Sequence, residues 1–430
     1  MRRNISKDWN LIDDDRTPAF GAVQYIPHRA RATDYVPKYM PEAIRSRILW
    51  KLDEIDPKAW NLLTRSEYPF LRHEFLSGLE RRGCLGRRTG WKPAHLIFEN
   101  AQGELIAGLP MYLKSNSFGE FVFDWAWADA YQRTGLEYYP KLVVAVPFTP
   151  ATGPRILIAE QYRSDEMWQK VLTTAIDTAR RFEVSGLHLL FSNNPGDLEH
   201  PDLLRRAGCQ FHWTNRGYSE FGDFTDSLTA KKRKLIKRER RLIADSGIEL
   251  ERIPGNEVST RQWDEFYTHY RSTFDQYANF AALTREFFLQ IARTMGEQVL
   301  LVVARRAHRM IASAYFLVGP SALYGRYWGC SEAIPGLHFE ACYYQGIEYC
   351  IEKKLVRFEP GAQGEHKISR GFLPTRTWSG HWIKDTRFRA AIAQFLHQES
   401  LRMNQTIDDL NQHSPYREGV VDSEKGTGSR

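Results

Sequence analysis

The segment from Glu359 to Arg370 has the residue types that acyl transfer to an amine requires. A free amine has a pKa of about 10.4 and is almost fully protonated at pH 7, so a carboxylate or an imidazole must take its proton. Glu359, Glu365 and His366 are the candidate bases. Lys367 and Arg370 could hold a phosphate or carboxylate of a substrate, and backbone amides of this glycine-containing segment could face an oxyanion. The alternative is a loop whose charges are only solvated.

Two neighbouring segments supply further candidates for substrate binding. In a strand expected at 323–330, Tyr324, Arg326 and Trp328 share one face, which would place a cation between two aromatic rings. A helix expected from residue 337 begins with His338 and Glu340. The candidate substrate-binding residues are therefore Tyr324, Arg326, Trp328, His338, Glu340, Tyr344, Lys367 and Arg370.

Asp124 is a further catalytic candidate, in the first half of the chain. Residues 121–129 alternate as in a strand, with aromatic residues on one face and Asp124 among small residues on the other. A carboxylate in such surroundings suits the floor of a cleft, because burying it without a partner is costly. The alternative is a structural aspartate that accepts hydrogen bonds from loop amides.

The strongest charge feature is the run from Lys231 to Arg241, in which eight of eleven residues are basic. Leu228, Leu235 and Leu242 recur at seven-residue spacing, so we expect a helix with one apolar docking face and a cationic remainder. Phosphates of a tRNA acceptor end, a nucleotide or a lipid headgroup would suit it. The candidate phosphate-binding or tRNA-binding residues are Lys231, Lys232, Arg233, Lys234, Lys237 and Arg238. A solvated helix that bridges two domains is the alternative.

One order of elements occurs twice, which predicts a duplicated fold. A helix from residue 73, strands near 95–98 and 105–109, a helix at 171–182 and a strand at 186–190 make the first copy. The second copy has a helix from residue 285, strands at 300–303 and 310–314, a helix at 343–353 and a strand at 356–359. Mixed strands followed by a crossover helix imply an α/β (α+β) sheet that is partly parallel.

Length and composition fit two domains. A chain of 430 residues exceeds the usual limit of about 250–300 for one core, and 42% hydrophobic residues exclude global disorder. We expect an arm at 1–60 with one helix from about Pro41 to Leu52, domains at 61–225 and 226–411, and a disordered tail at 412–430. No secretory signal or transmembrane run is evident, so we expect a cytoplasmic protein. Five cysteines without metal-ligand spacing indicate neither a disulfide framework nor a metal site.

Six segments of the sequence, taken together, resemble a known family. They are Gly83–Trp91, Val122–Tyr131, Pro147–Pro154, Tyr324–Cys330, His338–Glu340 and Glu359–Lys367. Over residues 60 to 400 the chain is similar to the FemAB-like family, labelled peptidoglycan biosynthesis/recognition, which is placed in the acyl-CoA N-acyltransferase (GNAT) superfamily. The resemblance implies a tandem pair of GNAT-like folds.

The resemblance also implies an N-acyltransferase or aminoacyltransferase that acts on an amino-bearing acceptor such as a peptidoglycan precursor. Its co-substrate would be aminoacyl-tRNA or acyl-CoA, with no tightly bound cofactor. The Gln/Arg-x-x-Gly-x-Gly/Ala loop that grips CoA pyrophosphate in ordinary acetyltransferases is missing, which favours the tRNA. No catalytic residue is carried over from the family. A non-catalytic module that recognises a cell-wall peptide or glycan is the alternative.

Overall fold

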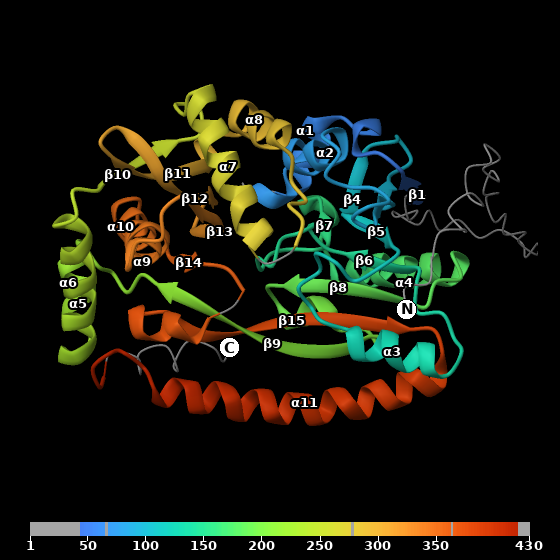
Figure 1. The fold of residues 1–430 in the computed structure, drawn as a ribbon. Coiled ribbons are helices and arrows are strands. Elements are labelled where there is room, and N and C mark those ends of the chain that lie inside the picture. The colour runs from blue at the N-terminus through green and yellow to red at the C-terminus, as the bar shows by residue number, and fades with distance from the viewer. Residues whose placement is uncertain (1–43, 65–67, 277–278, 363, 420–430) are drawn as a thin grey trace, which may run out of the picture. The chain divides into compact units, whose positions relative to one another are not determined.

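An 11-stranded mixed sheet joins the two halves of the chain (Figure 1). The computed structural model describes residues 44–64, 68–276, 279–362 and 364–419, which belong to a compact unit spanning 43–430. The strand order of the large sheet is β10-β11-β12-β13-β14-β9-β15-β8-β6-β5-β2, and a second sheet has the order β1-β3-β4-β7.

The first half contains nine strands and four α-helices among its described residues. They are β1 (Arg45–Leu49), α1 (Pro57–Thr64), α2 (His73–Arg81), β2 (Trp91–Pro93), β3 (His95–Glu99), β4 (Leu105–Leu109), β5 (Met111–Lys114), α3 (Trp125–Arg133), β6 (Lys141–Val144), β7 (Leu157–Ile158), α4 (Asp165–Arg181), β8 (Gly186–Ser192) and β9 (Leu204–Thr214).

The second half follows a similar course. Its elements are α5 (Phe221–Asp226), α6 (Ala230–Ala244), β10 (Glu249–Pro254), α7 (Thr260–Gln276), α8 (Arg285–Thr294), β11 (Val299–Arg306), β12 (Arg309–Val318), β13 (Ala322–Cys330), α9 (Leu337–Phe339), α10 (Gln345–Glu352), β14 (Arg357–Glu359), β15 (Leu373–Ile383) and α11 (Thr386–Gln412). A π-helical segment, Glu340–Tyr344, joins α9 to α10.

The duplication predicted from the sequence is confirmed. In each half an antiparallel strand pair leads to a crossover helix and a parallel strand: β5, β6, α4 and β8 in the first, and β12, β13, α10 and β14 in the second. The equivalent helices α2 and α8 pack on each other, with the rings of Phe75 and Phe287 5.4 Å apart. The fold is therefore a tandem duplication of one α/β unit, and the two copies share a mixed sheet.

The two halves exchange their last strands. β9 is the last strand of the first half but pairs with β14 of the second, while β15 is the last strand of the second half and pairs with β8 of the first. β9 and β15 pair antiparallel with each other, and α11 packs against both (Figure 1). This exchange makes one continuous sheet out of two copies.

The main apolar core also spans both halves. It includes Phe70 and Phe75 from the first half together with Phe287 and Tyr324 from the second. None of the helices in the described ranges combines the length and apolarity needed to cross a membrane.

Three local predictions are wrong. The helix predicted from Pro41 to Leu52 is strand β1 where it is described, because residues 45–49 pair antiparallel with β3. The strand predicted at 121–129 is helix α3 from Trp125 onward. Its alternating pattern also has helical spacing, since Trp127 and Tyr131, four residues apart, are the buried residues of α3.

The third error concerns the docking face of α6. The buried residues of this helix are Ile236 and Ile243, whereas Leu235 is half-buried and Leu242 is exposed. Ion pairs of Glu239 with Arg370 and of Arg240 with Glu340 hold the helix in this rotation. Of the predicted tail, residues 420–430 lie outside the described ranges, while Tyr416 is buried and donates a hydrogen bond to the carbonyl of Gly371 at 2.7 Å.

Candidate functional site

A cavity of about 300 Å³ lies where β13 and β14 diverge. The two strands pair in parallel over three residues each, Ala322–Tyr324 of β13 and Arg357–Glu359 of β14. β13 then continues to Cys330, whereas β14 ends at Glu359. The gap is lined by Ala314, Tyr315, Phe316, Gly325, Arg326, Tyr327, Trp328, His338, Cys342, Tyr343, Pro360, Gly361, Ala362, His366 and Lys367. Five of the predicted site residues therefore meet in one place.

A β-bulge shapes the β13 wall of this cavity. Tyr315 pairs with Tyr327 and Phe316 with Gly325, so Arg326 is an extra residue in β13. A bulge removes a residue from the ladder and switches the faces of those that follow.

The bulge overturns the predicted aromatic sandwich. Tyr324 packs in the main core against Tyr68 and Phe70, whereas Trp328 packs on the other side of the sheet. Arg326 instead lies over the ring of Phe70 at 5.5 Å, and its guanidinium donates to the carbonyl of Phe148 in the first half.

His338 supplies an uncharged imidazole to the cavity. Its ring stacks edge-on against Trp328 and Tyr343, with centroid distances of 5.4 and 5.2 Å. Burial, aided by the nearby His366 and Lys367, lowers the pKa of His338 to about 4. Within the described ranges no hydrogen-bond partner reaches either ring nitrogen, so the ring can accept a proton from a ligand.

Lys367 and His366 also line the cavity. Lys367 is buried, its Nζ donates to the carbonyl of Gly361 at 2.8 Å, and burial lowers its pKa to about 8. His366 Nε2 lies 2.9 Å from the hydroxyl of Tyr343, and burial also lowers the pKa of His366. The cavity thus carries two imidazoles and one amine that titrates near neutrality.

Tyr343 and Cys342 line the cavity and were not among the predicted site residues. The π-helical segment 340–344 brings Tyr343 beside His338, five residues earlier, and such segments are frequent at functional sites. The α-helical spacing assumed from the sequence places residues three and four apart on one face, so it gave no signal for this pair. Burial raises the pKa of Cys342 well above its usual range, which keeps the thiol protonated.

Glu359 and Glu365 lie away from the cavity lining. Glu359 is buried and accepts hydrogen bonds from the backbone N–H and the hydroxyl of Thr152, with Arg357 Nη2 at 2.9 Å. Glu365 is exposed. Of the predicted bases, only His366 therefore reaches the cavity.

Three predicted substrate-binding residues fasten helix α6 instead. Arg370 pairs with Glu239 at 2.6 Å, and Tyr344 donates a hydrogen bond to the same carboxylate. Glu340 pairs with Arg240 at 3.1 Å. These side chains position α6 against the second half and do not line the cavity.

The basic residues of α6 point outward. Lys231, Lys234, Lys237 and Arg238 are exposed and Lys232 is half-buried, and no ion pair to these five occurs within the described part of the chain. Arg233 pairs with Asp226 at 3.1 Å. The helix therefore presents a cationic surface.

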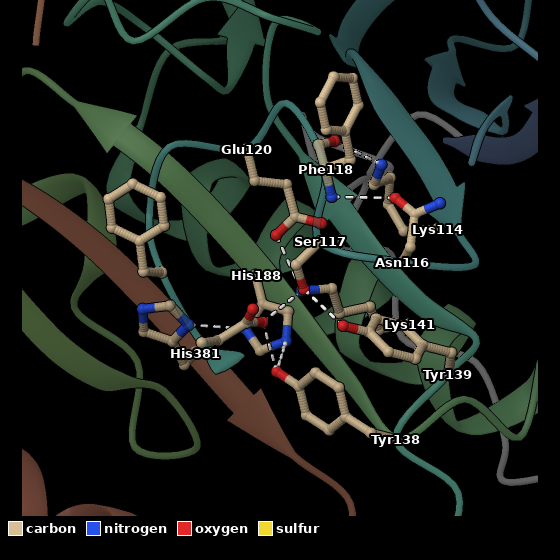
Figure 2. A network of polar contacts seen from close by, with 12 residues as sticks. Lys114, Asn116, Ser117, Phe118, Glu120, Tyr138, Tyr139, Lys141, His188 and His381 are labelled. Atoms are coloured by element: carbon tan, nitrogen blue, oxygen red, sulfur yellow. Dashed lines mark hydrogen bonds and ion pairs between the residues drawn. The ribbon is translucent and has the colours of Figure 1, made fainter. Parts of the chain in front are cut away.

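Asp124 lies in a buried polar network of the first half, where it pairs with Lys141. Figure 2 shows Lys141 and Glu120 of this network. Lys141 pairs with both carboxylates, at 2.8 Å in the case of Glu120. Burial alone would raise the pKa of Asp124, but the nearby ammonium of Lys141 lowers it to about 2. Burial raises the pKa of Glu120 to about 7 and lowers that of Lys114 to about 7. No sequence motif had marked Lys141, because it stands inside an apolar strand.

Comparison with known proteins places these features in a family. A model of the FemAB-like family, described as peptidoglycan biosynthesis/recognition, matches residues 51–418. No significant match occurs among curated proteins.

Several solved structures are similar to this chain. One is the C-terminal domain (DUF2156) of a putative lysylphosphatidylglycerol synthetase from Agrobacterium fabrum, with 9% identity, a TM-score of 0.49 and coverage of 82% of this chain and 97% of that one. Another is FemX, with 10% identity, a TM-score of 0.49 and coverage of 79% and 98%. A third is L-PGS from Bacillus licheniformis, with 10% identity, a TM-score of 0.47 and coverage of 80% and 96%.

Proposed function

The chain belongs to the FemAB-like family of peptidoglycan biosynthesis/recognition proteins, and from this premise we propose that it is an N-acyltransferase that forms an amide on an amino-bearing acceptor. One observation carries the proposal: the cavity between β13 and β14 is lined by both the uncharged imidazole of His338 and the amine of Lys367. A neutral proton acceptor and a nearby cation are what aminolysis of an acyl donor uses.

In the proposed reaction the acceptor nitrogen attacks the acyl carbon, and the bond between this carbon and the leaving oxygen breaks. The nitrogen becomes acidic as the new C–N bond forms, so His338 takes its proton and returns it to the leaving group. In this proposal the Lys367 ammonium stabilises the oxyanion, and a backbone N–H at the bulge of Arg326 is a second candidate donor.

We propose aminoacyl-tRNA as the donor. The loop before α9, residues 331–336, would face the pyrophosphate of CoA in an ordinary acetyltransferase, yet Pro335 lacks an N–H and Glu332 adds a negative charge paired to Arg306. The exposed basic residues of α6 suit a polyanion. A charged-tRNA donor would imply action in the cytoplasm, and the family description supports a peptidoglycan precursor as the acceptor.

The direct test combines donor binding with transfer. Bulk tRNA charged with radiolabelled amino acids, or radiolabelled acetyl-CoA, is incubated with the protein and a soluble UDP-linked muropeptide. We expect label on the muropeptide from the tRNA and at least a tenfold lower rate for His338→Gln. Mass spectrometry of the ligand that co-purifies with the protein identifies the donor independently. Label from neither donor in the wild-type protein would contradict the proposal.

A non-catalytic module that recognises a cell-wall peptide or glycan is the second candidate. Phe121, Phe123 and Trp125 favour it, because these aromatic side chains are 40%, 55% and 53% exposed and follow one another closely. Trp127 and Trp328 do not extend this surface, since they are buried and half-buried. In the same experiment, a muropeptide that binds and stays unlabelled would support this reading.

A further inference from the structure

A second cavity, of about 230 Å³, lies between β9, β15 and the loop before α3. Its lining includes Ser379, Arg206 and the aromatic side chains of Phe121, Phe123, Phe191 and Trp378. Ala362 lines both this cavity and the first one.

Two lining residues have a strained backbone. Phe121 and Phe191 have φ values of +59° and +58°, which bulky residues rarely adopt. Phe191 is also the extra residue of a bulge in β8, opposite Trp378 and Ser379. Strain and bulges of this kind are enriched at functional sites, where they redirect side chains.

A chain of hydrogen bonds leads from this cavity into the buried network of Asp124. The Ser379 hydroxyl lies 2.9 Å from His381 Nε2, and His381 Nδ1 lies 2.6 Å from His188 Nδ1. His188 Nε2 lies 3.4 Å from the hydroxyl of Tyr138, which in turn donates to Asp124 at 2.5 Å. Figure 2 shows His381, His188 and Tyr138 in this sequence.

The charge of Asp124 fixes the direction of every bond in this chain. Ionised Asp124 beside Lys141 can only accept, so Tyr138 donates to it and receives its own hydrogen bond from His188 Nε2–H. Burial lowers the pKa of His188 to about 3 and that of His381 well below its usual range, so both rings are neutral and carry one proton each.

The remaining two bonds follow from these tautomers. His188 carries its proton on Nε2, so its Nδ1 is bare and accepts from His381 Nδ1–H. His381 Nε2 is then bare and accepts the Ser379 proton. The Ser379 hydroxyl therefore donates its hydrogen to His381, and toward the cavity it can only accept a hydrogen bond.

We propose that this second cavity is a subsite for the amino group of an amphipathic ligand, with Ser379 Oγ as its hydrogen-bond acceptor. The aromatic side chains of Phe121, Phe191 and Trp378 receive the apolar body. Glu399 offsets part of the positive charge of Arg206 through two hydrogen bonds of 2.8 and 2.7 Å, which reduces its repulsion of a cation. Only the identification of this ligand as the acceptor of acyl transfer rests on the proposed function.

The test uses three probes that share one apolar body: 3-phenylpropylamine, 3-phenylpropanol and 3-phenylpropanoate. Their affinities for the full-length protein are measured by calorimetric titration without any donor. We expect the amine to bind tightest and the carboxylate weakest, since the latter offers no N–H or O–H at neutral pH. Ser379→Ala should weaken amine binding about tenfold, the size of one hydrogen bond to a charged group.

Ser192→Ala is the matched control, because Ser192 is a buried serine of the adjacent strand that bonds to Asn194 and Asp197 outside this cavity. Thermal unfolding of both variants confirms that they fold. Tyr138→Phe keeps Ser379 but cuts the chain, and we expect it to reduce the preference for the amine over the carboxylate at least threefold.

Histidine ¹⁵N spectra test the bond directions separately. We expect His381 as the Nδ1–H tautomer and His188 as the Nε2–H tautomer. Tighter binding of phenylpropanoate than of phenylpropylamine, or equal amine affinity in wild type and Ser379→Ala, would overturn the subsite. Amine binding as expected without any transfer to a muropeptide would leave the subsite standing and contradict the proposed function alone.

Discussion

The carboxylate of Glu359 accepts hydrogen bonds from the backbone N–H of Thr152 at 3.1 Å and from its hydroxyl at 2.6 Å, although 207 residues separate the two in the chain. Glu359 ends β14, directly before the segment that lines the first cavity. Thr152 belongs to the proline-containing loop of the first half. The first half therefore helps to fix the edge of a cavity that the second half encloses.

The link predicts a stability difference between two threonine substitutions. Thr152→Val removes the hydroxyl donor and leaves a buried carboxylate one partner short, so we expect the free energy of unfolding to fall by about 1–3 kcal/mol. Thr152→Ser keeps the donor and should stay within about 1 kcal/mol of wild type. Urea denaturation of both variants measures this, and equal midpoints would mean that the contact adds nothing to stability.

The repeated elements were predictable from the sequence because apolar periodicity and turn residues are local signals. α2 and α8, the β3–β4 hairpin and β11–β12, and the crossover helices α4 and α10 all lie where the pattern indicated. The exchange of β9 and β15 could not be predicted, since pairing between strands distant in the chain leaves no local pattern.

The candidate site was predicted only in part, for a similar reason. His366 and Lys367 were found because polar residues in a glycine-containing segment mark a site, and His338 was found at the start of the helix expected from residue 337. The bulge at Arg326 removed Tyr324 from the expected face, since one extra residue reverses the alternation. The partners of Glu359 and Arg370 come from residues more than a hundred positions away, so their structural roles were invisible in the sequence.

Buried neutral histidines predict a loss of stability in acid. Burial lowers the pKa of His188 to about 3 and that of His212 to about 4, below the value near 6.5 of an unfolded chain. A lowered histidine pKa stabilises the fold fully above pH 6.5, and this contribution is lost as the pH falls toward the folded value. Between pH 6.5 and 5 each such histidine should cost about 2 kcal/mol.

Glu120 opposes this trend. Burial raises its pKa to about 7, so its contribution is present below its unfolded value and is lost as the pH rises toward 7. Because His188, His212 and also His381 oppose Glu120, the free energy of unfolding should still decrease from pH 6.5 to 5. His212→Gln should flatten the decrease by about 2 kcal/mol, and an unchanged slope would contradict the assignment of His212 as a buried neutral ring.

The exposed basic residues of α6 predict salt-dependent binding of a polyanion. Replacing Lys231, Lys234 and Lys237 by Gln should weaken tRNA binding and reduce the slope of log affinity against log salt by about one to three. Replacing Lys58, Lys170 and Lys353, which are exposed on other elements, changes the net charge equally and is the matched control. The same loss in both triple variants would indicate a general charge effect.

The close approach of α7 to β13 at Gly329 predicts that a side chain at this position destabilises the fold. A Cβ at this position would lie 1.9 Å from the backbone carbonyl oxygen of His269, so even alanine requires the helix to move. We expect Gly329→Ala to lower the free energy of unfolding by about 3 kcal/mol or more. Gly325→Ala is the comparison, because its Cβ would meet no atom closer than 3.2 Å, and a smaller loss should result. Equal losses would show that the α7 contact is not what excludes a side chain.

Lys367 predicts an unusually reactive amine inside the first cavity. Burial lowers its pKa to about 8, so about half of it is uncharged at pH 8, whereas an ordinary lysine with a pKa near 10.4 is almost entirely protonated. Since only the uncharged amine attacks an acylating reagent, limiting amounts of acetic anhydride at pH 8 should modify Lys367 faster than its small exposure suggests. Peptide mass spectrometry across pH 6 to 10 should give an inflection near pH 8 for Lys367, while labelling of the exposed Lys170 keeps rising. An inflection above pH 9.5, or no labelling of Lys367 while Lys170 reacts, would mean that the cavity neither lowers this pKa nor admits an acyl group.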